Sequence, residues 1–215
     1  MARTATTANA LLGLLALRPE WTTWELTTQL RRNMRFFWPR AESRILAELK
    51  RLESDGLVRA RKESVGRRPR TVYAITADGQ RHLAGWLDAA PRATTLESEP
   101  LLRVLLGNLG STPAIHRALD QVERDAHDIL EVGRTVAAEY AAGEAPFQDE
   151  VHVRAFVFDY LVMHASGMLD WVQRSRRALD EWPQLSEDQR AARAIERIAA
   201  HARTLPAPPA DSSPP

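Results

Sequence analysis

Apolar residues in the first part of the chain recur every three to four positions, which is the spacing of amphipathic helices. This recurrence predicts helices over residues 7–17, 22–33 and 40–54. Thr22 and Glu25 have the spacing of a capping box, in which each residue satisfies a backbone or side-chain donor of the other. We therefore expect the second helix to begin at this pair.

The pattern then changes to short segments rich in β-branched and aromatic residues. Residues 57–62 and 71–75 are predicted strands, joined by a basic loop at residues 66–70. Thr76 can cap a further helix, which is predicted over residues 77–88. Helix, helix, helix, strand, strand, helix is the order of elements in a winged helix-turn-helix, and we expect that fold here.

The elements predict a mainly α protein in four parts. Residues 1–88 form the winged helix-turn-helix, and residues 89–111 a linker with a short helix. Residues 112–203 form a helical domain for dimerisation and effector binding, with a capping box at residues 186–189 opening its last helix. Residues 204–215 are rich in proline and are predicted to be disordered.

Two long helices, residues 112–142 and 147–182, dominate the helical domain. Apolar residues of the first keep a 4,3 spacing over about three heptads, interrupted at Gly133, as in helices that pair with a partner helix. Residues 156–163 of the second are apolar nearly all round and are expected to be deeply buried. We predict that two chains pair through these helices. The predicted dimer contacts are Ile115, Leu119, Val122, Ile129, Val136, Phe158, Leu161 and Met168.

The net charge of +1 conceals an asymmetry between the two halves. Residues 1–88 carry 16 basic and 9 acidic side chains, a net charge of +7, whereas residues 89–215 carry 13 and 19, a net charge of −6. A basic part joined to an acidic part suggests that only the first faces a polyanion. Because 27 of the 29 basic residues are arginine, the location of the charge is more informative than the choice of arginine.

Compartment and membrane predictions rest on composition. The chain has no cysteine, which excludes disulfides and fits a cytoplasmic protein. No apolar run approaches the roughly 18 residues that span a bilayer. Residues 8–17 resemble the apolar core of a signal peptide, but no clear cleavage site follows and the next helix needs this segment as a packing partner.

The predicted third helix and the basic loop carry the residue types that bind duplex DNA. The start of a recognition helix enters the major groove, where arginine can bind guanine, glutamate can accept from cytosine, and serine can reach bases or phosphate. The predicted base-reading residues are Arg40, Glu42, Ser43 and Arg44. The predicted backbone and wing contacts are Lys50, Arg51, Arg67, Arg68 and Arg70. Taken alone, the three loop arginines are better explained as facing water, but their position directly after a helix-turn-helix pattern favours DNA.

The ordered series of motifs resembles PadR-type transcriptional regulators. The resemblance rests on residues 45–52 (ILAELKRL), 55–58 (DGLV), 66–70 (GRRPR) and 73–76 (YAIT). Residues 99–106 (EPLLRVLL) are similar to the opening of that family's C-terminal domain.

This resemblance implies a homodimer that represses by binding a near-palindromic operator and is released by a small effector. The arginine-rich wing corresponds to Arg67, Arg68 and Arg70. One departure is Leu46, which stands where the family usually has a tyrosine in the recognition helix. A role of that tyrosine hydroxyl cannot be transferred to this chain. The alternative interpretation is a winged helix that pairs with protein instead of DNA.

Enzyme, cofactor and metal sites are not predicted. The sequence has no phosphate-binding glycine loop, nucleophile elbow or triad spacing. His116 and His127 share a helix face but stand about 16 Å apart, too far to bind one metal ion. Glu123 and His127 have the spacing of a ligand pair, although a surface ion pair explains that spacing better.

Aromatic residues could line a pocket for a small apolar or aromatic effector. The predicted pocket residues are Trp86, Tyr160, His164 and Trp171. Plain core and dimer packing is the alternative interpretation of these side chains.

Overall fold

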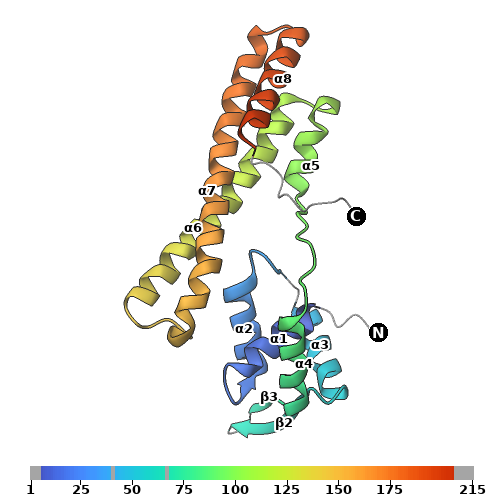
Figure 1. Cartoon of the computed structure of the whole chain (residues 1–215), viewed down its shortest axis with the longest axis vertical. Coiled ribbons are helices and arrows are strands. Elements are labelled where there is room, and N and C mark those ends of the chain that lie inside the picture. Colours follow the sequence, from blue (N-terminus) through green and yellow to red (C-terminus); the bar gives the residue numbers. More distant parts are fainter. Residues whose placement is uncertain (1–5, 40–41, 66–67, 206–215) are drawn as a thin grey trace. The chain divides into compact units, whose positions relative to one another are not determined.

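The computed structural model describes residues 6–39, 42–65 and 68–205, with the backbone alone at residues 42, 65, 68 and 69. The chain forms two compact units that meet in sequence between Thr95 and Leu96 (Figure 1). Helices dominate both, and the first also holds a small antiparallel sheet. The predicted fold class is confirmed. The tail predicted to be disordered lies outside the described residues from residue 206 onward.

The first unit has the predicted order of elements, with one short strand added. Its elements are α1 (Thr6–Ala16), β1 (Trp21–Thr22), α2 (Thr23–Met34), α3 (Glu42–Ser54), β2 (Val58–Val65), β3 (Arg68–Ile75) and α4 (Ala77–Asp88). The capping box of Thr22 and Glu25 is present, with the Thr22 amide donating to Glu25 at 2.7 Å and the Glu25 amide donating to Thr22 at 3.2 Å. The predicted start of α2 is therefore confirmed.

Helix α1 lies at the centre of this unit and contacts α2, α3, α4 and β3. Its Leu11, Leu12 and Leu15 side chains are fully buried. Each such leucine contributes about 1.5–3 kcal/mol through removal of its apolar surface from water. The apolar run that resembles a signal-peptide core is thus a core helix of the folded unit.

The connection between α3, the sheet and α4 depends on two glycines. Gly56 has a φ of +71°, a left-handed conformation that ends α3 and that side chains disfavour. The Thr76 hydroxyl donates to the Gly56 carbonyl at 2.8 Å and accepts from the Gly79 amide at 3.0 Å, so it caps α4 as predicted. A side chain at Gly79 would collide with the Leu57 carbonyl, because α4 approaches the start of β2 closely.

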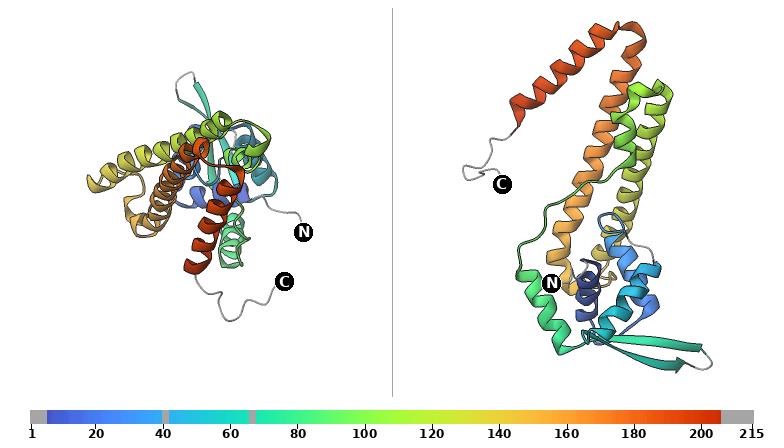
Figure 2. Two further views of the ribbon diagram at one scale, coloured as in Figure 1. Left: turned by 90° about the horizontal axis from the view of Figure 1, so that it is seen from above. Right: turned by 90° about the vertical axis from the view of Figure 1, so that its right-hand side faces the viewer.

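The sheet has the order β1-β3-β2, and its two long strands form a hairpin that extends beyond the helices of the unit (Figure 2, right). Sequence periodicity predicts shorter strands, residues 57–62 and 71–75, and does not predict β1. The outer part of the hairpin pairs polar residues, for instance Glu63 with Arg70, so it lacks the apolar alternation of a half-buried strand. β1 is two residues long and pairs only with Val72 and Tyr73.

The second unit is helical. Its elements are α5 (Glu99–Leu105), the short 3-10 helix η1 (Gly107–Leu109), α6 (Thr112–Ala141), η2 (Gln148–Glu150), α7 (Val151–Glu181), η3 (Trp182–Gln184) and α8 (Glu187–Thr204). Ser186 and Gln189 form the predicted capping box of α8. Ser111 occupies the N-cap position of α6, and its side chain makes no capping hydrogen bond there. The second long helix begins at Val151 instead of residue 147, because Phe147 adopts a left-handed conformation with a φ of 63°.

Helices α6 and α7 pack side by side (Figures 1 and 2). The apolar residues of α6 from Ile115 to Ile129 are buried within the chain. Ile115, Leu119 and Val122 form one cluster with Val172 and Leu179 of α7. Four predicted dimer contacts, Ile115, Leu119, Val122 and Ile129, are therefore already buried within a single chain. Their assignment to the dimer interface needs correction, because the chain's own α7 supplies the partner helix.

Two further contacts hold this helix pair together. Gly133, which interrupts the heptads of α6, faces the Phe158 ring, whose nearest atoms would lie 3.8 Å from a side-chain carbon at this glycine. The Arg176 guanidinium of α7 donates to Asp120 at 2.6 Å and to Glu123 at 2.7 and 2.9 Å. Hydrogen bonding to Arg176 lowers the pKa of Glu123. Glu123 therefore has an interhelical arginine partner, which sequence spacing with His127 does not reveal.

The outer face of α7 is apolar and exposed, contrary to the burial predicted for residues 156–163. Phe156, Tyr160 and Met163 are 73, 60 and 74% exposed within the chain. Only one side of α7 contacts α6, so the all-round apolar pattern leaves the other side uncovered.

No helix in the described ranges combines the length and apolar character needed to cross a membrane.

Candidate nucleic-acid interface

Helix α3 separates a buried face from an exposed face. Ile45, Leu49 and Leu52 are buried in the core of the first unit. Ser43 and Arg44 are exposed on the first turn, and Lys50 is exposed further along the helix. The burial of one face fixes the orientation of the helix, so the opposite face is presented to solvent as a polar and basic surface.

The other predicted contacts of α3 differ in their surroundings. Arg51 donates to the Glu48 carboxylate at 2.6 and 3.1 Å, so its guanidinium already has a partner on the same helix. Leu46 is half-buried and has no hydroxyl to replace that of the family tyrosine. Arg40 and the Glu42 side chain lie outside the described residues, and their base-reading role stays a prediction.

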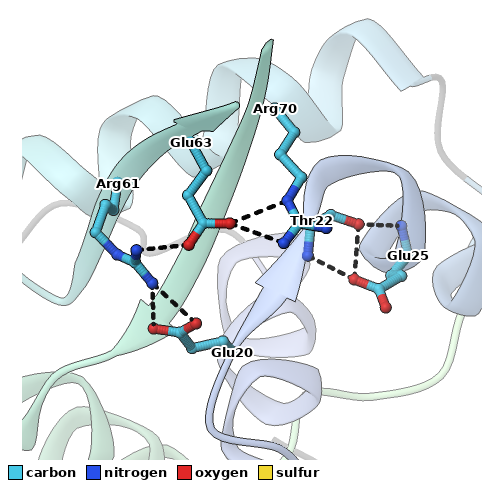
Figure 3. Close-up of polar contacts among 6 residues, drawn as sticks. All are labelled: Glu20, Thr22, Glu25, Arg61, Glu63 and Arg70. Carbon is cyan, nitrogen blue, oxygen red and sulfur yellow. Dashed lines mark hydrogen bonds and ion pairs between the residues drawn. The ribbon is translucent and has the colours of Figure 1, made fainter. Parts of the chain in front are cut away.

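The wing hairpin carries a chain of ion pairs on one face (Figure 3). Arg70 of β3 donates to the Glu63 carboxylate of β2 at 2.8 and 3.0 Å. The same carboxylate lies 2.5 Å from the Arg61 guanidinium, which also donates to Glu20 at 3.1 Å. Four charged groups thus alternate in sign along the sheet. Arg67 and the Arg68 side chain, the other predicted wing contacts, lie outside the described residues.

The charged groups in this series of ion pairs stabilise one another. Hydrogen bonding from Arg70 is the main cause that lowers the pKa of Glu63; desolvation opposes it, and the nearby charge of Arg61 adds to the lowering. Hydrogen bonding to Glu20 and the charge of Glu63 raise the pKa of Arg61. Glu63 and Arg61 are therefore held in their ionised forms, and the Arg70 guanidinium lies against an acidic neighbour in the unbound protein.

An open groove runs along the wing beside the start of α2. Strands β2 and β3 contribute two cations, and α2 contributes residues of its first turn. The groove is lined by Thr22, Thr23, Trp24, Lys62, Arg70 and Thr71. Sequence reasoning did not find it, because its residues come from three separate segments. The one local signal was the capping box, which fixes the start of α2.

Thr22 and Glu25 hold this edge of the groove in place. The Thr22 hydroxyl donates to the Glu25 carboxylate at 2.7 Å, and this bond is the main reason that the pKa of Glu25 is lowered. Trp24, in the same first turn, is 72% exposed. The groove therefore combines two cations from the strands with threonine hydroxyls and an exposed aromatic ring at the start of α2.

The predicted effector residues lie on two different units. Trp86 belongs to α4 and is partly exposed. Tyr160 and His164 are exposed on α7, with their rings nearly parallel and 6.1 Å apart between centroids. Trp171 packs against the buried cluster of α6 and α7. Within the part of the chain that the structure describes, no three metal-binding side chains gather.

Comparisons with known proteins were made for both sequence and fold. The transcriptional regulator PadR-like family matches residues 11–85. No curated protein matches the chain. Among solved structures, the PadR-like transcriptional regulator BC1756 from Bacillus cereus is 18% identical, with a TM-score of 0.67, over 81% of this chain and 98% of that chain.

Two structures of Bacillus subtilis PadR have the same fold. The complex with operator DNA is 19% identical, with a TM-score of 0.68, over 81% of this chain and 99% of that chain. The complex with p-coumaric acid is 20% identical, with a TM-score of 0.63, over 82% and 100%. The resemblance seen in the sequence is thus confirmed: residues 11–85 match the PadR-like family, and 81% of the chain has the fold of solved PadR-like transcriptional regulators.

Proposed function

We propose that this protein is a sequence-specific transcriptional repressor that binds a near-palindromic operator as a homodimer in the cytoplasm. The observation that carries the proposal is the exposed face of α3, where Ser43 and Arg44 stand at the start of a helix whose other face is buried. Residues at this position of a recognition helix reach base edges in the major groove. The proposal has no catalytic, cofactor or metal-binding step.

Phosphate contacts are assigned to the wing and the groove beside it. Lys62 and Arg70 line this groove together with the first turn of α2, so a DNA backbone can lie along it. Contacts of this kind fix the position of the protein on the duplex without reading its sequence. Lys50 on α3, and Arg67 and Arg68 at the wing tip, are proposed to bind further phosphates.

The dimer is assigned to the outer face of α7. Val153, Phe156, Val157, Tyr160 and Met163 are spaced to lie on one side of the helix, and all are exposed in the single chain. A contiguous apolar face of this kind marks an interaction surface, and a two-fold axis would let it pair with the same face of a second copy. Such a dimer would present two winged helices about 34 Å apart, one turn of DNA.

The proposed test selects bound duplexes from random DNA with the full-length protein and two variants. Arg44→Ala should relax the preferred sequence, because a bidentate arginine contact discriminates between bases by about 1–3 kcal/mol. Lys50→Ala should weaken binding to all duplexes by a similar factor and flatten the salt dependence by about 0.9 in log–log slope. The wild-type protein should enrich a palindrome.

Two outcomes would contradict this proposal. No enrichment by the wild-type protein would favour the alternative, a winged helix that pairs with another protein. An unchanged preferred sequence for Arg44→Ala, measured beside the Lys50→Ala variant as the matched control, would remove Arg44 from the base-reading residues.

The effector is proposed to be a small aromatic compound. Bacillus subtilis PadR has been solved with p-coumaric acid, and α7 of the present chain exposes the stacked rings of Tyr160 and His164. Titrating p-coumaric acid into the protein–operator complex should release DNA in the wild type, and His164→Ala, which leaves the side chains of the proposed dimer face in place, should require a higher concentration. Retention of DNA at saturating p-coumaric acid would exclude this compound as the effector.

A further inference from the structure

Glu63 is the one acidic residue between Gly56 and Ala77, a segment that holds six basic residues. It lies in the outer part of the hairpin, opposite Arg70 in the strand register and two residues from Arg61 on the same strand. Both arginines bind its carboxylate (Figure 3). The single negative charge of the wing is thus placed where it engages two of its cations.

These ion pairs join groups that are largely exposed, so they contribute little to the stability of the fold. The side chains of Arg61 and Arg70 are 60 and 49% exposed, and pairs between exposed groups contribute little to stability. Arg61 also has Glu20 as a second partner. The four groups together carry no net charge, so this face of the wing is nearly neutral although the surrounding segment is basic.

We propose that Glu63 is a positioning residue that limits the affinity of the wing for DNA of any sequence. The inference rests on the proposed DNA-binding function. In the unbound protein Glu63 holds Arg61 and Arg70 extended along the sheet. A phosphate that binds either arginine must compete with a carboxylate of the same charge and similar bidentate geometry. The wing then contributes to the binding free energy only the amount by which its contact with phosphate is stronger than its contact with Glu63.

The charge of Glu63 also persists in the complex. Its pKa is lowered by Arg70, so the carboxylate remains ionised at neutral pH and repels an approaching phosphate. Part of the charge of Arg61 and Arg70 continues to compensate Glu63 instead of DNA. Fewer counterions are then released from DNA than the number of wing cations would suggest.

The test compares full-length wild type with Glu63→Gln, which keeps the shape of the side chain and removes its charge. Affinity for a duplex without an operator should rise about threefold to tenfold at 0.1 M salt, and the log–log salt slope should steepen by up to about 0.9. Glu20→Gln should have a smaller effect, because Glu20 binds only Arg61 of the two arginines.

A matched control variant and a mutant cycle with Arg61 and Arg70 distinguish this role from a general effect of charge. Glu196→Gln removes the same charge from an exposed position of α8, outside the proposed DNA interface, and should leave the salt slope unchanged. In a background with Arg61→Gln and Arg70→Gln, the gain from Glu63→Gln should disappear. Thermal unfolding of each variant shows whether the unit remains folded.

The outcomes distinguish this inference from the function on which it rests. Tighter binding and a steeper slope that both depend on Arg61 and Arg70 support the inference. Wild-type binding to duplex DNA with an unchanged or weaker Glu63→Gln variant overturns it and leaves the proposed function standing. Absence of salt-dependent binding by the wild-type protein overturns both.

Discussion

Replacing Phe156 and Tyr160 together by glutamate is expected to dissociate the proposed dimer into monomers. Both side chains are more than half exposed on the outer face of α7 and would be buried between two chains in the proposed dimer. Aromatic residues at the centre of an interface often contribute about 2 kcal/mol or more each. Two buried carboxylates would add desolvation and repulsion across the two-fold axis, so the dimer dissociation constant should rise at least about a thousandfold.

Sedimentation velocity over a range of protein concentrations measures this change directly. The matched control places glutamate at Thr135 and Gln173, two exposed polar positions of α6 and α7, and should remain a dimer. A monomeric double variant should also lose most of its operator affinity, because one winged helix reads only one half-site. A Phe156 and Tyr160 variant that sediments as the wild type would exclude this face of α7 as the dimer interface.

Leu119→Ala is expected to have the second large effect, on the stability of the helical unit. Leu119 is fully buried in the cluster shared by α6 and α7. Truncating a buried leucine to alanine typically costs about 2–5 kcal/mol, from lost apolar burial and the cavity left behind. Urea unfolding in the monomeric Phe156 and Tyr160 background measures the loss without a contribution from dimerisation.

The control for this measurement is Ile195→Ala on α8, where the side chain is 67% exposed and should change stability by less than about 0.5 kcal/mol. If Leu119 packed against a second chain, as the heptad pattern suggests, Leu119→Ala would have little effect in the monomeric background. A change below about 0.5 kcal/mol there would contradict packing of the seam within one chain.

Local chemistry explains why most helices of this protein can be predicted from sequence. A capping box needs only two residues three positions apart, and both Thr22 with Glu25 and Ser186 with Gln189 form the predicted contacts. Thr76 caps α4 in the same local way. The start of α7 was predicted less accurately, because the residue type of Phe147 does not indicate its left-handed backbone conformation.

The candidate interface was only partly predictable. The exposed positions of Ser43 and Arg44 follow from the apolar spacing of α3, and their DNA contacts remain predictions. The pairing of Glu63 with Arg70 depends on strand register and on a turn that sequence periodicity cannot position. The groove beside the wing needs the start of α2 to lie next to β3, which the long-range pairing of β1 with β3 brings about.

The sequence by itself determined the winged-helix order, the basic charge of the first unit and the presence of an apolar stripe on α6. Only the tertiary structure decided what covers that stripe. Hydrophobic burial has no direction and does not distinguish a helix of the same chain from one of another chain, so periodicity predicts a partner without identifying it. In this protein α7 covers the stripe, and the apolar face left without a partner is the outer face of α7 itself.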